Sequence, residues 1–137
     1  MSRNPVIFET RHRARFREID GYGHMNMTHY VTYISDHRFQ GMRDVLGLGF
    51  KELDELPVAF FIRQFEIEYL RPLMADQEFL IRSHVAELLR SQCYVDFEMT
   101  GDDGAKIATA RMRIGCIIKA TGKPGGWPAG LMERFFT

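Results

Sequence analysis

A glycine-containing segment around Asp20 gathers the side chains of this sequence that are best suited to acid–base chemistry. His24 and Asn26 follow Asp20 closely, and a helical pattern begins just after them. The N-terminus of a helix presents unpaired N–H groups and about half a positive charge. Such donors can bind an oxyanion, and a carboxylate beside them can act as a base or as a nucleophile. The segment is therefore a candidate hydrolytic site.

The same spacing also fits an ordinary turn. Asp20-Gly21 is a common turn pair, and single histidines are usually packed or solvated. The residue types alone therefore favour a structural turn, with hydrolysis as the second interpretation.

Other kinds of catalytic chemistry find less support. The sequence contains no G-x-S-x-G motif and no glycine-rich nucleotide loop. Cys93 and Cys116 stand in apolar alternating runs, which predicts that both are core residues without catalytic activation. His24 and His29 lack the four-residue spacing of a helical zinc motif, and no acidic residue completes one. We therefore expect no metal site.

The charge balance excludes several classes of partner. Lys and Arg number 18, Asp and Glu number 18, and the net charge is +0. A chain without basic excess has no general attraction for nucleic acid or anionic membranes. The longest apolar run, Val58–Ile62, is far shorter than the roughly 20 residues of a transmembrane helix. The arginine-rich start of the chain has no apolar block typical of a signal peptide, so we expect a cytoplasmic protein.

One long helix is predicted to carry the candidate site at its N-terminus. From about Thr28 the apolar residues recur every three or four positions, and Asn26 or Thr28 can serve as the N-cap. Gly47 and Gly49 end the pattern. Gly41 lies inside it, which a close approach of the helix to a sheet would explain.

The remaining segments alternate with a period of two and predict strands. These segments are Phe8–Arg17, Val58–Leu70, Glu78–Leu89, Ser91–Met99 and Lys106–Ile118. A short helix is expected from about Ala129. We predict an α+β fold forming a single domain over residues 1–137, with a largely antiparallel five-stranded sheet around one long helix.

The stretch from Arg17 to Asn26, followed by Tyr30, Tyr33 and Arg38, resembles the opening signature of hotdog-fold thioesterases. These are the 4-hydroxybenzoyl-CoA thioesterase-like acyl-CoA hydrolases, whose pattern is D-x-x-G-H-x-N-N, then a tyrosine and a late arginine. Two later stretches resemble the family in order and spacing. They are Ile67–Pro72, like the family's I-x-Y-x-R-P strand end, and Leu89–Ser91, like its L-x-K/R-S segment.

The resemblance implies a hotdog fold that forms a homodimer by extension of the sheet, and often a homotetramer. It also implies hydrolysis of an acyl-CoA thioester at a site shared by two subunits. Asp20 matches the catalytic carboxylate, as general base or as nucleophile. His24 and Asn26 would orient the reacting groups, and the backbone amides of Met27 and Thr28 would polarise the carbonyl.

Further positions match substrate contacts of the family. Arg90 and Ser91 match positions that contact the CoA phosphates and pantetheine, and Tyr30 is expected to bind substrate. No metal or redox cofactor is implied, because CoA enters as part of the substrate.

Two positions depart from the family pattern. Met27 replaces its second asparagine, and Ser35 replaces the helical acid three positions before Arg38. These departures leave two alternatives open, a non-catalytic subunit that binds acyl thioesters and an enoyl-thioester hydratase or dehydratase.

Overall fold

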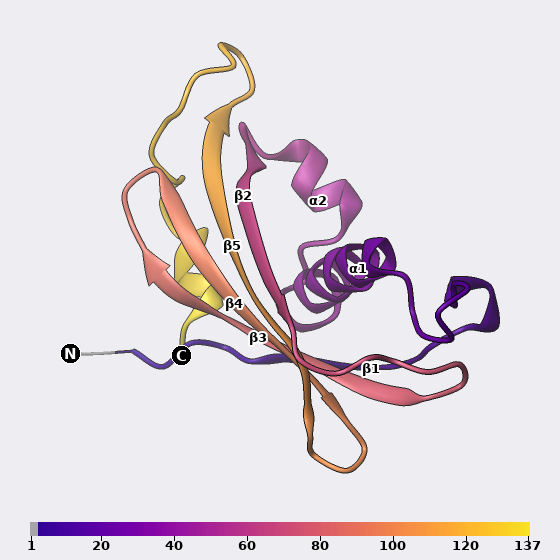
Figure 1. Cartoon of the computed structure of the whole chain (residues 1–137). Helices are drawn as coiled ribbons and strands as arrows, with labels where there is room; N and C mark the ends of the chain where they lie inside the picture. The colour runs from indigo at the N-terminus through magenta and orange to yellow at the C-terminus, as the bar shows by residue number, and fades with distance from the viewer. Residues whose placement is uncertain (1–2) are drawn as a thin grey trace.

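A curved antiparallel sheet wraps around one long helix in the computed structural model, which describes residues 3–137 (Figure 1). The strand order is β1-β3-β4-β5-β2, and every neighbouring pair is antiparallel. The elements are β1 (Phe8–Arg13), α1 (Met27–Leu46), α2 (Phe50–Glu55), β2 (Val58–Tyr69), β3 (Glu78–Leu88), β4 (Gln92–Gly101) and β5 (Lys106–Ile118). Two 3-10 turns, Phe16–Glu18 and Met132–Phe135, complete them.

The helix α1 begins and ends where the sequence predicts. Asn26 is its N-cap, because the side-chain oxygen accepts a hydrogen bond from the Thr28 amide at 3.0 Å. Gly47 ends the helix with a φ of 69°, a left-handed conformation that glycine adopts without strain. A Cβ at Gly41 would overlap the ring of Phe8, so the predicted close approach of helix and sheet is confirmed.

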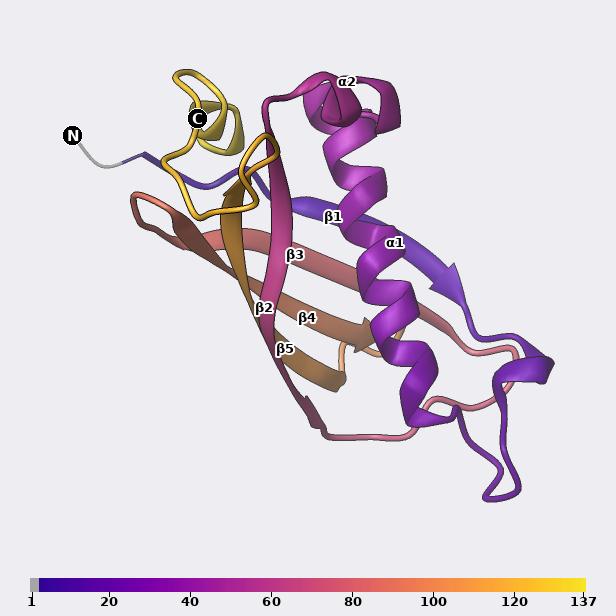
Figure 2. The ribbon, with the colours of Figure 1, turned by 90° about the horizontal axis from the view of Figure 1, so that it is seen from above.

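The core lies between α1 and the concave face of the sheet. Alternate residues of the central strands point into it, which gives β4 and β5 their alternating burial. The largest fully buried apolar side chains include Ile34, Phe79, Ile81, Met99, Met112 and Ile114. Both cysteines are buried and free, as expected. Figure 2 shows α1 lying across this face, with its preceding turn projecting beyond the sheet.

The first strand is shorter than its alternating pattern predicts. β1 ends at Arg13, and the chain then enters the 3-10 turn Phe16–Glu18. Phe16 is 84% exposed and lies outside β1, so the prediction of a strand that continues to Arg17 is wrong. The turn forms because the Glu18 carboxylate accepts the Arg15 amide at 2.7 Å, which bends the backbone out of the sheet.

A bulge also breaks the predicted alternation of β2. The register with β5 shifts between Ile62 and Gln64, so Phe61 pairs with Gly115 while Phe65 pairs with Met112. Phe61 and Phe65 therefore lie on opposite faces of the sheet, and the period of two predicted over Val58–Leu70 is broken at the bulge.

Two short helical elements, α2 and the 3-10 turn near the C-terminus, differ in how well the sequence indicates them. The sequence pattern did not indicate α2, whereas the short terminal helix is observed as a 3-10 turn at Met132–Phe135. Within residues 3–137, no helix is long and apolar enough to cross a membrane.

Candidate active site

The segment that carries Asp20 is a tight turn closed at its base by backbone hydrogen bonds. Ile19 and Met25 form an isolated antiparallel bridge. The Asp20 amide donates to the His24 carbonyl at 3.2 Å, and the Gly23 amide donates to the Asp20 carbonyl at 3.0 Å. These bonds fix the turn that positions the carboxylate of Asp20 beside the start of α1.

The Asp20 carboxylate is half-buried and is held at both oxygens. Its Oδ1 accepts a hydrogen bond from the Tyr22 amide at 2.9 Å. Its Oδ2 lies 3.5 Å from Nδ2 of Asn26, a longer contact. Asn26 thus contacts the carboxylate while it caps the helix, and an orienting role for its side chain stays a prediction.

The two backbone amides predicted to polarise a carbonyl differ in availability. The Thr28 amide donates to Oδ1 of Asn26 and is therefore occupied by the helix cap. The Met27 amide has no acceptor among the residues that the structure describes. Since Met27 is the first residue of α1, its N–H belongs to the positive end of the helix dipole.

A pocket of about 580 Å³ opens onto this turn. Its lining brings together Asp20, Tyr22, His24, Met25, Asn26, Met27, Tyr30, Tyr69, Leu70, Arg71 and Pro72. The structure therefore collects five of the predicted site residues around one space, and Thr28 is not part of its lining. One wall is the end of β2 and the segment after it, which the sequence singled out only through its motif.

His24 lines the pocket but makes no side-chain hydrogen bond to Asp20 or Asn26 within residues 3–137. Its ring stacks on Tyr22 at a centroid distance of 6.2 Å. An orienting role for His24 remains a prediction.

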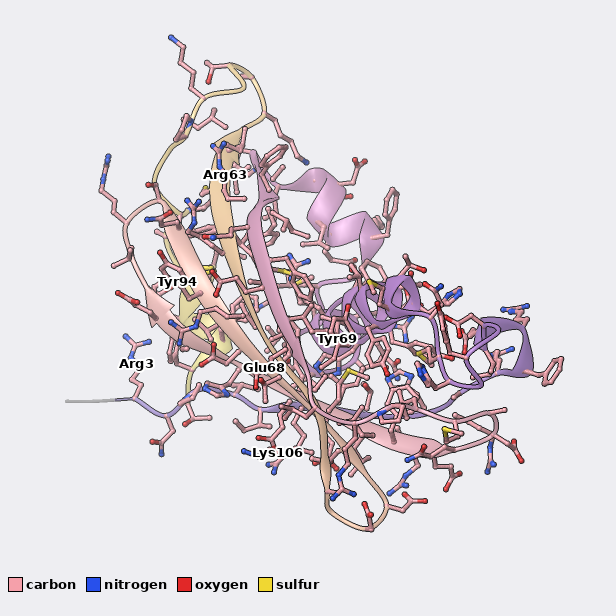
Figure 3. All side chains as sticks on the ribbon, viewed as in Figure 1. Arg3, Arg63, Glu68, Tyr69, Tyr94 and Lys106 are labelled. Carbon is pink, nitrogen blue, oxygen red and sulfur yellow. The ribbon has the colours of Figure 1, made fainter. Side chains whose placement is uncertain are left out.

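Two tyrosines form the aromatic wall of the pocket. Tyr30 is 2% exposed and packs edge-on against Tyr69, with ring centroids 4.8 Å apart. The Tyr69 hydroxyl donates to the Met27 carbonyl at 3.2 Å and so ties β2 to the first turn of α1. Figure 3 shows Tyr69 on the side of the sheet that faces this helix. Burial raises the pKa of both phenols, which therefore stay protonated at neutral pH.

Arg90 and Ser91 lie away from this pocket. They occupy the connection between β3 and β4. Figures 1 and 2 show that this connection and the turn before α1 lie at opposite ends of the folded molecule. Arg90 is exposed, and its carbonyl accepts a hydrogen bond from the Trp127 amide at 3.3 Å. One copy of the chain therefore does not bring Arg90 to Asp20.

Sequence reasoning missed the role of Glu18 beside this site. Its side chain is buried and accepts hydrogen bonds from the Arg15 amide and the Tyr33 hydroxyl. The sequence signal for this role is a glutamate three residues after Arg15, which is the spacing of a capping box. The motif is hard to recognise because it normally begins with Ser or Thr, and here it begins with arginine. Among residues 3–137, no group of three His, Cys, Asp or Glu side chains could hold a metal ion.

Comparison with known sequences identifies a family. The family model described as the thioesterase-like superfamily matches residues 14–135, which include every residue of the pocket. No curated protein sequence matches the chain.

Solved structures with the same fold include several enzymes named as thioesterases. A probable thioesterase from Escherichia coli, YbaW, superposes with a TM-score of 0.83 at 23% identity, over 93% of this chain and 95% of that one. A 1,4-dihydroxy-2-naphthoyl-CoA thioesterase from Synechocystis gives 0.84 at 13% identity, over 95% and 96%. A Staphylococcus aureus protein in complex with CoA gives 0.86 at 19% identity, over 98% and 84%.

Proposed function

The chain belongs to the thioesterase-like superfamily and has the hotdog fold, and from this premise we propose that it hydrolyses acyl-CoA thioesters to the free acid and CoA. The observation that carries the proposal is the pairing of a held carboxylate and a free helix amide in one pocket. Asp20 and Met27 both line it, and the Met27 N–H has no acceptor within residues 3–137.

The chemistry of a thioester suits this pairing. Its carbonyl carbon is electrophilic and its thiolate is a good leaving group. Asp20 either removes a proton from the attacking water or attacks the carbonyl itself to give an anhydride that water then cleaves. In both routes negative charge develops on the carbonyl oxygen, where the Met27 N–H and the helix dipole stabilise it.

CoA is the proposed carrier of the acyl group. One structural relative is in complex with CoA, and another is named as a CoA thioesterase. We propose that Tyr30 and Tyr69 contact the substrate in the pocket, and that Arg90 and Ser91 of a second copy contact the CoA moiety. A second copy is needed because one chain holds these residues and Asp20 at opposite ends.

Replacing the carboxylate tests the function directly. Asp20→Asn keeps the shape of the side chain, but the amide can neither accept the proton of water nor attack the carbonyl. We expect acyl-CoA hydrolysis to fall at least about 100-fold, the lower range for loss of a positioned base. The measurement is thiol release with short, long and aromatic acyl-CoAs. Asp54→Asn, an exposed aspartate of α2, is the matched control and should retain wild-type turnover.

Near wild-type thiol release by Asp20→Asn would remove Asp20 from the mechanism. No thiol release by the unaltered protein with any of these acyl-CoAs would point to a non-catalytic subunit. A change in absorbance of an enoyl thioester without free thiol would point to a hydratase.

A further inference from the structure

Glu18 hydrogen-bonds to the start of its own 3-10 turn, to α1 and to the N-cap that precedes α1. Its carboxylate Oε1 accepts the Arg15 amide at 2.7 Å and the Tyr33 hydroxyl at 2.6 Å. Its backbone carbonyl accepts the Asn26 amide at 2.9 Å. Side chain and main chain of a single residue thus hold together the 3-10 turn, α1 and the N-cap of α1.

The burial of Glu18 sets it apart from the acids that pair with the arginines of β1. Glu18 is buried, whereas the side chains of Asp76 and Asp102 are 83% and 58% exposed and pair with Arg13 and Arg11. A buried carboxylate costs free energy unless hydrogen bonds replace its water. The Arg15 amide and the Tyr33 hydroxyl replace that water at Oε1 of Glu18. Loss of either donor while the carboxylate stays buried would therefore cost free energy.

Tyr33 provides the fixed end of this connection. It lies on α1, and its ring packs on His12 of β1 and Phe79 of β3 with centroid distances of 5.4 and 5.1 Å. Burial, and then the hydrogen bond to Glu18, raise the pKa of Tyr33 to about 12. The phenol therefore remains a donor across the neutral range.

The effect of Glu18 reaches Asp20 through Asn26. The carbonyl of Glu18 holds the Asn26 amide, and Nδ2 of Asn26 lies 3.5 Å from the Asp20 carboxylate. Neither Glu18 nor Tyr33 lines the pocket, so neither can act on a substrate there directly. Any influence on turnover must pass through the position of the turn.

We propose that Glu18 and Tyr33 are positioning residues: their hydrogen bond fixes the turn that carries Asp20 against α1. The proposal rests on the proposed function in one respect: it takes the Asp20 carboxylate to be the catalytic group. The fixing itself can be measured without any substrate.

Tyr33→Phe removes the hydroxyl that donates to Glu18 at 2.6 Å and also lies 3.2 Å from the Arg13 carbonyl, and it leaves the packing of the ring. We expect amide hydrogen exchange at Gly23 and Asn26 to accelerate about tenfold, the order expected for one lost hydrogen bond. Amides of β5, such as that of Met112, should keep their wild-type exchange rates. With acyl-CoA, kcat should fall by a similar factor of about ten while KM stays within about twofold, because the carboxylate moves but the aromatic wall of Tyr30 and Tyr69 does not.

Two variants of Glu18 separate positioning from charge. Glu18→Gln keeps a carbonyl oxygen that can accept both donors, so it should exchange and turn over close to the wild type. Glu18→Ala removes the acceptor and should match or exceed the effect of Tyr33→Phe. Tyr94→Phe is the matched control, because Tyr94 lies on the face of the sheet away from α1 (Figure 3) and should change neither quantity.

Unchanged exchange at Gly23 and Asn26 in folded Tyr33→Phe would overturn the proposal, whatever happens to Glu18→Ala. Faster exchange at the turn with unaltered kcat would overturn the catalytic part of it. Faster exchange in a protein whose wild type releases no thiol would support the fixing of the turn and refute the thioesterase function, so the two failures are distinguishable.

Discussion

At the scale of single residues, the amides at the start of α1 allow a sharp test of the oxyanion site. Proline is well tolerated at the first position of a helix, because the N–H it lacks has no partner within the helix. Met27 holds that position, and the preceding Asn26 has φ −61° and ψ 138°, a conformation compatible with a following proline. Met27→Pro should therefore preserve the fold and remove one N–H.

We expect Met27→Pro to lower kcat about 100-fold or more, the usual cost of losing one oxyanion donor. Met27→Ala removes the side chain but keeps the amide, and should retain most of the activity. Thermal unfolding of both variants should stay close to that of the wild type. Equal activity of the two variants would show that the carbonyl oxygen is bound elsewhere.

The residues that the sequence could identify are those whose chemistry is local. Asp20 and Asn26 precede the start of a helix by a few residues. Their positions in the sequence are therefore enough to predict that the carboxylate lies near the N-cap. Glu18 and Tyr69 were missed in their roles because their partners, Tyr33 and Met27, are distant in sequence. Which of the Met27 and Thr28 amides stays free also depends on which one donates to Oδ1 of Asn26, and only the fold decides that.

At the scale of elements, a buried chain of polar groups joins α1 to β1 and β3. His37 of α1 is fully buried, with Nδ1 2.7 Å from the Thr10 hydroxyl and Nε2 2.6 Å from the Ser83 hydroxyl. Thr10 also lies 2.6 Å from Nε2 of His12. If His12 and His37 are both protonated, both rings donate to the Thr10 oxygen. The Thr10 hydroxyl proton then has neither ring nitrogen left as an acceptor. Burial lowers the pKa of His12, and the negative charge of Asp36 opposes that shift only in part.

This network predicts that acid weakens the packing of helix on sheet. Burial, and then the neighbouring His12, lower the pKa of His37 from 6.5 to about 4. A pKa below the unfolded value means that His37 contributes stability above pH 6.5, which is lost as the pH falls toward 4. The loss can reach about 3 kcal/mol.

Urea unfolding between pH 7 and 4 measures this loss. His37→Gln cannot titrate in this range and should show a weaker pH dependence of the unfolding free energy between pH 6.5 and 5, above most carboxylates. His29→Gln, a histidine nearer the helix start and outside this network, is the control. The same pH dependence in His37→Gln and wild type would contradict the assignment.

Element boundaries show where periodicity succeeds and where it fails. The long helix and most strands were predictable because one face of each is buried against a common core. The early end of β1 and the bulge in β2 were not, since a hydrogen bond to Glu18 and a shift of register leave no mark on apolar alternation. The six-residue α2 is too short for a periodic signal.

At the scale of the whole molecule, β2 is an edge strand whose outer side has no strand paired to it within residues 3–137. It is 12 residues long, and Phe61, Ile62 and Tyr69 are each more than 40% exposed. A long apolar edge favours pairing with another strand. Antiparallel pairing of two β2 strands would set the Tyr69 end of one copy, next to its Asp20 pocket, beside the Val58 end of the other.

We therefore expect the chain to be a dimer through β2 and to need that dimer for turnover. Ile62→Glu places two like charges near the centre of the paired edge and should shift the protein toward a monomer, measured by light scattering after size exclusion. Acyl-CoA hydrolysis should fall with the dimer fraction, although Asp20 and Met27 are unaltered. Ile7→Glu is the matched control, since Ile7 is 43% exposed against 44% for Ile62 and lies beside β1, on the opposite edge of the sheet. A monomeric Ile62→Glu with full activity would mean that one chain holds the complete site, and that CoA is bound by residues other than a partner's Arg90 and Ser91.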